Sequence, residues 1–337
     1  ELMEWSVAEF GGRGVGQTPF VELGNEPDLP FFWPGKIDSY VETMTVLAEA
    51  AQRGKEAGGL AEEDVLVANG GLSFAGPEGD RRSRAFLQKV DPGVLDAIAY
   101  HAHGPGIQAE RRAYERLYQA MAEADLPAMP VFDTESGFSG TNPAGLLEQA
   151  RTVVEKLAFA QSKGLPTLLY FRLFMENDRG YGMTDNGIEP RPSVLAYRSL
   201  VQRLRRHRFV RPLDTDGRAD AAAVTAFLFS SHEDNEIPRW TLVAFSEEPA
   251  RYELNLQLAD SGPQIDTPAV YDLFGNASPA RLVTPAVASL SVGVDPVFLT
   301  WQADTDPDEI RLIEPLLAAE AAGPLPTGTT STVHVSI

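Results

Sequence analysis

The chain has 337 residues and a formal net charge of −20, because 48 acidic residues outnumber 28 lysines and arginines. A surface this acidic repels phosphate backbones and anionic lipids, which argues against binding to nucleic acid or to a membrane surface. The absence of cysteine excludes disulfide bonds and thiol chemistry, and the 43% hydrophobic content is typical of a globular protein.

Short apolar strands alternate with amphipathic helices over residues 1–205, which we assign to a first domain. The expected strands are Phe20–Gly24, Val65–Asn69, Leu95–His101, Met129–Thr134 and Thr167–Leu173. The clearest helices are Ile37–Ala57, Gln108–Glu123, Pro143–Lys163 and Val194–Arg206. Crossovers of this length are typical of a parallel sheet flanked by helices, so the sequence predicts an α/β fold here.

The pattern changes near residue 206, where short strands separated by turn residues replace the helices. The expected strands are Val224–Ser230, Trp240–Ser246, Tyr252–Leu258, Ala269–Phe274, Val297–Trp301 and Ile310–Ile313. This pattern favours an all-β sandwich over residues 206–317. Residues 318–337 are rich in Ala, Gly, Pro and Thr, which indicates a linker or tail with Val333–Ile337 as a candidate last strand.

Two glutamates stand at the carboxyl ends of predicted strands. Glu26 follows Asn25 and precedes Pro27, which stops the strand, and Glu135 ends the run that begins at Val131. In a parallel α/β barrel the carboxyl ends of the strands form the active site. Either glutamate alone would be read as a solvated strand end, but together they are the two carboxylates that retaining glycoside cleavage requires.

The residues Gly24-Asn25-Glu26-Pro27-Asp28, together with Thr134-Glu135, resemble the signature of strands four and seven in clan A glycoside hydrolases. Those enzymes are (β/α)8 barrels that cleave glycosidic bonds with retention. The run 190–198 and the attached sandwich are most similar to family 39, the β-xylosidase and α-L-iduronidase type, with families 79 and 5 as near alternatives. The resemblance implies that Glu26 is the acid/base, Glu135 the nucleophile and Asn25 a substrate-positioning neighbour. It also implies a glycoside, oligosaccharide or polysaccharide substrate and no cofactor.

The resemblance also bears on how many strands of the barrel this sequence contains. If Phe20–Gly24 is the fourth barrel strand, only 19 residues precede it, where three βα units stand in the family. We therefore expect a TIM-type barrel that is incomplete at its N-terminus, with about strands four to eight, followed by the sandwich. A longer protein, a separate chain that completes the barrel, or a barrel without activity would each account for this.

His101 and His103 lie two residues apart on the expected sixth strand, so both face the same side of the sheet. Many clan members carry His-x-Tyr at this place, and here His103 replaces the tyrosine. A second interpretation is a metal site formed by His101 and His103 with Asp133 or Glu135, which would make the protein a metal-dependent hydrolase.

Two further residues are candidates for sugar binding. Trp33 lies in an aromatic cluster after Glu26 and would either stack on a sugar or pack beneath its loop. Arg172, near the end of the eighth strand, would either bind a hydroxyl or acidic sugar or pair with a neighbouring carboxylate. The rim would include Glu176, Asn177, Asp178, Asp185 and Asn186. A non-catalytic carbohydrate-binding protein with a relic barrel is the alternative from another functional class.

Overall fold

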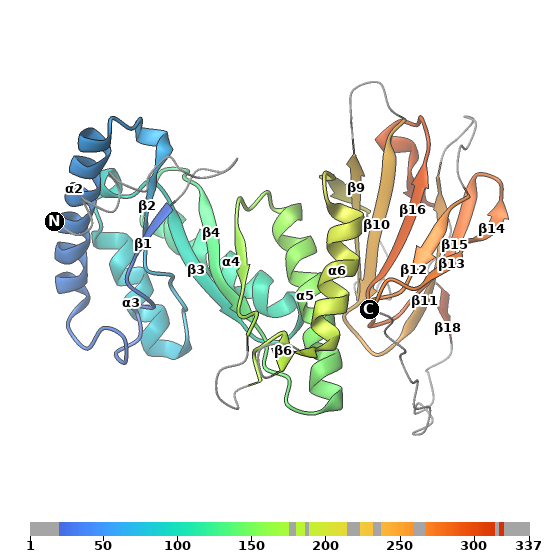
Figure 1. The fold of residues 1–337 in the computed structure, drawn as a ribbon, viewed down its shortest axis with the longest axis horizontal. Coiled ribbons are helices and arrows are strands. Elements are labelled where there is room, and N and C mark those ends of the chain that lie inside the picture. Colours follow the sequence, from blue (N-terminus) through green and yellow to red (C-terminus); the bar gives the residue numbers. More distant parts are fainter. Residues whose placement is uncertain are drawn as a thin grey trace. The chain divides into compact units, whose positions relative to one another are not determined.

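The computed structural model describes residues 20–174, 180–185, 189–213, 223–231, 237–258, 267–313 and 317–319. Contacts divide the chain into two compact units, Glu1–Arg198 and Ser199–Ile337, and the boundary falls inside helix α6 (Pro192–Leu204) (Figure 1). The predicted rim residues 176–178 and 186 and the predicted last strand lie outside the described residues. No described helix is both long and apolar enough to cross a membrane.

The first unit is built from parallel strands and the helices that connect them. The strands are β1 (Phe20–Leu23), β2 (Leu66–Asn69), β3 (Ile98–His103), β4 (Val131–Gly137) and β5 (Leu168–Tyr170). The helices are α2 (Ile37–Gly58), α3 (Gly76–Lys89), α4 (Gly106–Glu123) and α5 (Pro143–Ser162), with short 3-10 helices η1 (Glu62–Asp64) and η2 (Pro92–Val94). β1 pairs with β2, and β3, β4 and β5 pair in that order. Parallel bridges Ala68–Ala97 and Leu72–Tyr100 join the two sets.

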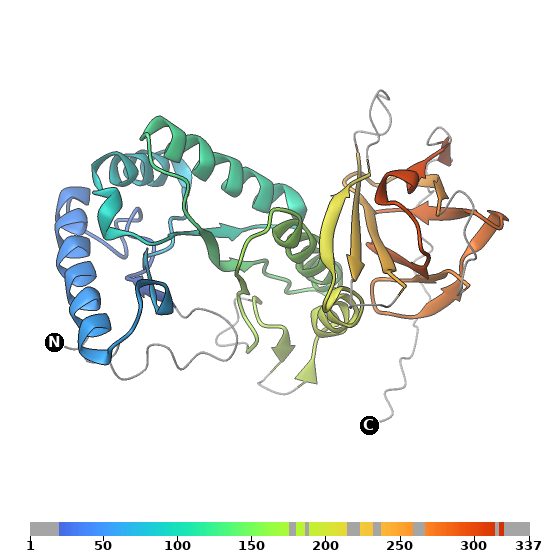
Figure 2. The same ribbon diagram turned by 90° about the horizontal axis from the view of Figure 1, so that it is seen from above.

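Alternation along β3 decides which side chains enter the core. Ile98 and Tyr100 face the helices, where Met44 of α2, Phe86 of α3 and Leu117 of α4 complete a buried apolar cluster. Seen from above, helices α2, α3 and α4 follow one another around the outside of these strands (Figure 2). The opposite face carries the small side chains Ala97 and Ala99 and then His101 and His103, so both histidines leave the core face.

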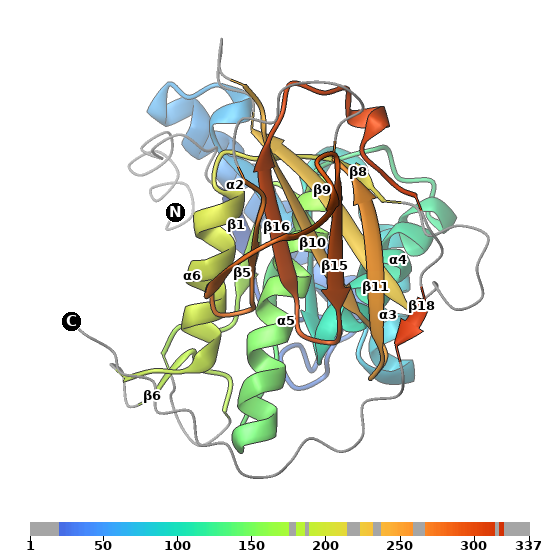
Figure 3. The same ribbon diagram turned by 90° about the vertical axis from the view of Figure 1, so that its right-hand side faces the viewer.

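The second unit consists of antiparallel sheets. A six-stranded sheet has the order β13-β12-β16-β10-β9-β8, and a five-stranded sheet joins β14, β15, β11 and β17, with β18 also paired to β11 (Figure 3). Leu228, Trp240 and Leu299 of the first sheet and Leu254 and Leu290 of the second share one buried core. The bounds are β8 (Arg208–Pro212), β9 (Val224–Ser231), β10 (Arg239–Ser246), β11 (Arg251–Gln257), β12 (Ala269–Tyr271), β13 (Ala277–Pro279), β14 (Arg281–Thr284), β15 (Val287–Val292), β16 (Val297–Gln302), η3 (Pro307–Glu309), β17 (Arg311–Leu312) and β18 (Leu317–Ala319).

Most of the secondary structure expected from the sequence is present. β1 to β5 overlap the five predicted strands of the first domain, and α2, α4, α5 and α6 overlap the four predicted helices. All six strands predicted in the second domain are also found, as β9, β10, β11, β12, β16 and β17. Helix α3 and strands β8, β13, β14, β15 and β18 were not predicted from the sequence, and β18 overlaps the start of the expected linker. A small antiparallel pair, β6 (Thr184–Asp185) with β7 (Glu189–Pro190), was also not expected.

Candidate active site

The turn after β1 presents Glu26. Gly24 has a φ of 95° and Glu26 a φ of 40°, both in the left-handed region that most side chains avoid. The Tyr40 hydroxyl of α2 donates to the Leu23 carbonyl at 2.7 Å and accepts from the Gly70 amide at 2.8 Å. This turn is therefore tied to both α2 and the end of β2, and it leaves the Glu26 side chain only 8% exposed.

A buried carboxylate holds the next residues of this loop. Asp28 accepts hydrogen bonds from the Ser73 hydroxyl at 2.8 Å and from the Phe74 amide at 3.0 Å. Burial raises the pKa of the Asp28 carboxyl, and the hydrogen bonds from Ser73 oppose this rise. The Arg82 guanidinium of α3 donates to the carbonyls of Pro27, at 2.9 Å, and Trp33, at 2.8 Å. The loop that carries Glu26 is thus fixed from both sides.

Glu26 contacts the first histidine of β3. His101 Nδ1 lies 2.9 Å from Glu26 Oε1, and His101 Nε2 lies 3.8 Å from Glu22 Oε1. Burial alone lowers the pKa of His101, but the carboxylates of Glu22, Glu26 and Glu135 outweigh it and raise the value to about 9. His101 is therefore an imidazolium at neutral pH that donates a hydrogen bond to Glu26.

Glu22 is a site residue that the sequence analysis missed. Its Oε1 accepts from the Gly71 amide at 2.6 Å and from the Thr134 hydroxyl at 2.8 Å. Glu22 therefore links the ends of β1, β2 and β4 beneath His101. The available signal was an acidic residue in the middle of the otherwise apolar run Phe20–Leu23.

Glu135 contacts the second histidine. His103 Nε2 lies 3.0 Å from Glu135 Oε1. The rings of Tyr181 and Phe171 pack edge-on against the His103 ring, with distances between ring centres of 5.5 and 5.8 Å. Burial opposes ionisation of Glu135, yet the hydrogen bond to His103 and the positive charges of His101, His103 and Arg172 hold its pKa below the usual value. Glu135 is therefore a carboxylate at neutral pH.

A bulge in β4 decides which carboxylates reach this face. Tyr100 pairs with Asp133, but His101 pairs with Glu135, so one extra residue is inserted at Thr134. Strict alternation would put Asp133 and Glu135 on the same face. Instead Asp133 is fully buried and raised in pKa, first by burial and then by the charge of Glu110 on α4. The metal-ligand set with Asp133 is therefore wrong.

The structure brings together a different candidate metal set. Glu26, His101 and His103 each offer one ligand atom, and these atoms lie within 4.8 Å of one another. One carboxylate and two imidazoles are donors that Zn²⁺ accepts. These three residues could therefore hold a cation if the ion displaces the proton of His101, and Glu26 would then be a ligand instead of an acid–base group.

The remaining predicted residues differ in exposure and in contacts. Asn25 is exposed beside Glu26, and Arg172 is half-buried with its guanidinium carbon 4.9 Å from the centre of the Phe171 ring. The Trp33 indole N–H donates to Ser39 Oγ at 3.2 Å, and its ring packs on Tyr40 at 5.3 Å. These contacts favour the packing alternative for Trp33, while Phe31 in the same loop is 86% exposed.

Gly71→Ala tests the support beneath His101. A Cβ at residue 71 would lie 2.1 Å from His101 Nε2, so the imidazole must move. We expect the substitution to lower the free energy of unfolding by about 1–3 kcal/mol and to reduce any turnover. Urea unfolding and kcat/KM would measure both effects. Gly293→Ala is the matched control, because its Cβ would meet only ordinary contacts at 3.7 and 3.9 Å; equal effects in the two variants would contradict the expectation.

His101 also predicts a pH dependence of stability. Because its pKa of about 9 in the folded protein lies above the ordinary 6.5, its stabilisation is complete below pH 6.5 and is lost as pH rises through 9. Between these two pH values the free energy of unfolding of the native chain should fall by on the order of 2 kcal/mol more than that of the His101→Gln variant. Denaturant unfolding at pH 6, 7.5 and 9.5 would measure this difference, and parallel curves for the two proteins would rule out the ion pairing.

Comparisons with known proteins identify the fold. No family sequence model matches the chain, and no curated protein sequence is significantly similar to it. Among solved structures, a family 39 glycoside hydrolase from Bacteroides cellulosilyticus WH2 matches with a TM-score of 0.65 and 19% identity, over 89% of this chain and 60% of that chain. A monomeric β-xylosidase from Caulobacter crescentus CB15 matches with a TM-score of 0.52 and 16% identity, over 89% of this chain and 73% of that chain.

A further match comes from another family. AbfB, a family 51 α-L-arabinofuranosidase from Bifidobacterium longum, has a TM-score of 0.60 and 11% identity, over 83% of this chain and 66% of that chain. The chain therefore has a glycoside hydrolase fold of the family 39 type. It spans 60% of the length of the Bacteroides enzyme that it matches.

Proposed function

We propose that this protein is a retaining glycoside hydrolase that uses Glu26 and Glu135 in a double displacement. The observation that carries the proposal is the pair of glutamates at the ends of β1 and β4, each hydrogen-bonded to a histidine of β3. The likeness in fold to family 39 enzymes supports the same reading. The substrate would be a glycoside, an oligosaccharide or a polysaccharide.

In the first step Glu135 would attack the anomeric carbon, because its lowered pKa keeps it ionised. Glu26 is the carboxylate partner of the His101 imidazolium in the free protein, so it would act as the acid only after it has taken up a proton; it would then give that proton to the glycosidic oxygen as that bond breaks, leaving a sugar esterified to Glu135. The His101 imidazolium would then donate to the new Glu26 carboxylate across 2.9 Å. In the second step Glu26 would take a proton from water as the water attacks the ester, which restores both groups.

The proposal extends to the architecture. We infer that β1 to β5 and their helices correspond to about strands four to eight of a (β/α)8 barrel, and that the second unit is the β-sandwich expected over residues 206–317. In this proposal Asn25 and Arg172 bind substrate.

A second candidate function uses the metal set. The cluster of Glu26, His101 and His103, with ligand atoms within 4.8 Å of one another, is the observation that favours a metal-dependent hydrolase as the second candidate. In that case Glu26, His101 and His103 would hold the ion, which would supply the polarisation of water needed for hydrolysis, and Glu26 would be a ligand rather than the acid/base. The two mechanisms therefore assign Glu26 different chemistry.

Turnover on a panel of aryl glycosides, measured on purified native protein, tests the proposal. We expect hydrolysis with retained anomeric configuration, followed by NMR, and no change after dialysis against a chelator. Loss of turnover in the chelator, restored by Zn²⁺, would replace the proposal by the metal mechanism. Silence across the panel together with glycan binding would replace it by the non-catalytic reading.

A further inference from the structure

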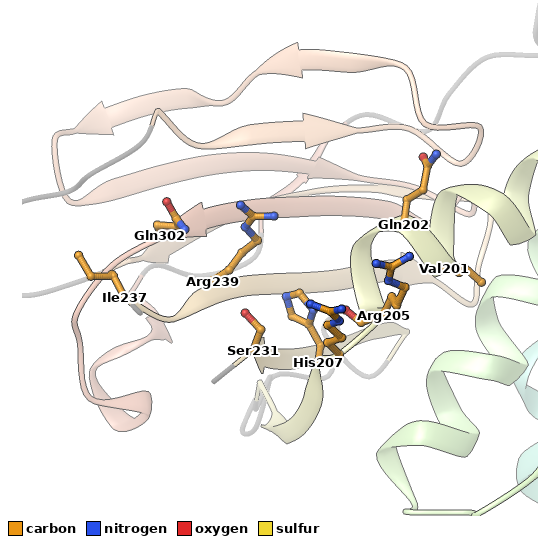
Figure 4. A pocket seen from close by; sticks show the side chains of 9 residues that line it. Val201, Gln202, Arg205, His207, Ser231, Ile237, Arg239 and Gln302 are labelled. Atoms are coloured by element: carbon orange, nitrogen blue, oxygen red, sulfur yellow. The ribbon is translucent and has the colours of Figure 1, made fainter. Parts of the chain in front are cut away.

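A second hollow lies entirely within the second unit. It has a volume of about 410 Å³ and is formed by the C-terminal end of α6, the turn that follows it, and one end of the six-stranded sheet (Figure 4). A connected hollow of about 810 Å³ shares five of its residues and continues along the sheet. Polar side chains that line the two hollows include Arg205, His207, Arg239, Thr241, Thr300 and Gln302. We call this feature the basic groove.

The floor of the basic groove is a row of polar side chains fixed by strand register. Arg239 of β10 pairs with Ser231 of β9 on one side and with Gln302 of β16 on the other. Thr241 and Thr300 pair with each other one step further along. Because side chains two residues apart share a face, these five side chains lie on the same surface of the sheet.

The charge of the basic groove contrasts with that of the whole chain. None of the described residues that line either hollow is Asp or Glu, although acidic residues outnumber basic ones 48 to 28 overall. Arg205 and Arg239 are exposed and line both hollows. Burial and the charge of Arg239 lower the pKa of His207, so the positive charge comes from the arginines.

Arg203 is a different kind of residue from these two. Its guanidinium donates to the Ser199 carbonyl at 2.7 Å and lies 3.8 Å above the Tyr271 ring. It therefore closes one wall of the larger hollow. Arg205 and Arg239 are the cations that we assign to a ligand.

We propose that the basic groove binds the carboxylates of an acidic oligosaccharide, at a site separate from Glu26 and Glu135. Arginine pairs with planar carboxylates through two parallel hydrogen bonds, and the Ser, Thr and Gln side chains of the floor suit sugar hydroxyls. That the anion is a saccharide rests on the proposed function, whereas the preference for an anion rests on the groove alone.

Isothermal titration calorimetry on the full chain tests this site with three probes: a hexuronic acid trisaccharide, a neutral hexose trisaccharide and sodium sulfate. We expect the acidic trisaccharide to bind most tightly, and more weakly at higher salt. Arg239→Gln and Arg205→Gln should each weaken its binding by about tenfold or more. Arg208→Gln, an exposed arginine on β8 that lines neither hollow, is the matched control and should bind as the native chain does.

Equal binding of the neutral trisaccharide, equal binding of sulfate, or native affinity in both arginine variants would each overturn the proposal. If Arg239→Gln does not fold, the affinity of Arg205→Gln for the acidic trisaccharide tests the proposal by itself. Turnover of a neutral aryl glycoside, measured in parallel, should not change in either arginine variant. If the acidic trisaccharide binds in a way that depends on Arg239 but no glycoside is turned over, the proposed function is refuted and the binding role of the basic groove stands. If a glycoside is turned over but no such binding occurs, only the binding role of the basic groove is refuted.

Discussion

Replacing Glu135 by alanine is expected to reduce turnover of an aryl glycoside by about 10⁴-fold or more, because the carboxylate proposed to form the ester intermediate is removed. The His103 contact at 3.0 Å and the lowered pKa both equip Glu135 for attack. The variant removes a half-buried side chain at a strand end, so it should still fold. Steady-state kinetics with circular dichroism would measure both properties.

Azide adds a sharper readout to the Glu135→Ala variant. The small anion can enter the space left by the carboxylate, so it should restore part of the activity and give a glycosyl azide of inverted configuration. Glu42→Ala, an exposed glutamate on α2, is the matched control and should keep native kinetics. Native activity in Glu135→Ala would refute the nucleophile assignment.

Replacing Glu26 by glutamine is expected to reduce turnover by about 10²- to 10⁴-fold for substrates with poor leaving groups, because the proton donor is lost. Glutamine keeps the volume of the side chain and can still accept the hydrogen bond from His101, so the fold should be retained. A substrate with a dinitrophenolate leaving group needs no protonation, and its first step should slow far less. Burst kinetics on the two substrates would measure this difference.

Leaving-group dependence separates two roles of Glu26. If Glu26 only positions His101, Glu26→Gln should lose the same fraction of its turnover on both substrates. That result would contradict the acid/base assignment. If Glu26 is a metal ligand, the variant should lose bound metal together with activity. The acid/base role predicts a loss that grows with the pKa of the leaving group.

The main helices and strands could be predicted because their apolar periodicity is strong, and α3 shows where this signal fails. Its sequence begins Gly-Pro-Glu-Gly, and Phe86 and Leu87 are its only large apolar residues. Its burial depends on Arg82, whose guanidinium caps three loop carbonyls of residues distant in sequence. Such contacts have no local pattern, so the sequence could not predict this helix.

The candidate site was predictable in its glutamates and histidines but not in how they pair. The period of two correctly placed His101 and His103 on one face. The bulge at Thr134, however, depends on pairing between β3 and β4, and it moved Asp133 to the helix side. Glu22 was missed for a similar reason, since its partners Gly71 and Thr134 come from other strands.

Covalent trapping tests the central claim most directly. A dinitrophenyl 2-deoxy-2-fluoro glycoside of a sugar that the native protein hydrolyses should form a stable ester, because the fluorine slows both steps while the good leaving group keeps only the first step fast. Intact mass should rise by one fluorosugar, and peptide mass spectrometry should locate it on Glu135. A label on another residue, or continued turnover with no label, would contradict the double displacement through Glu135.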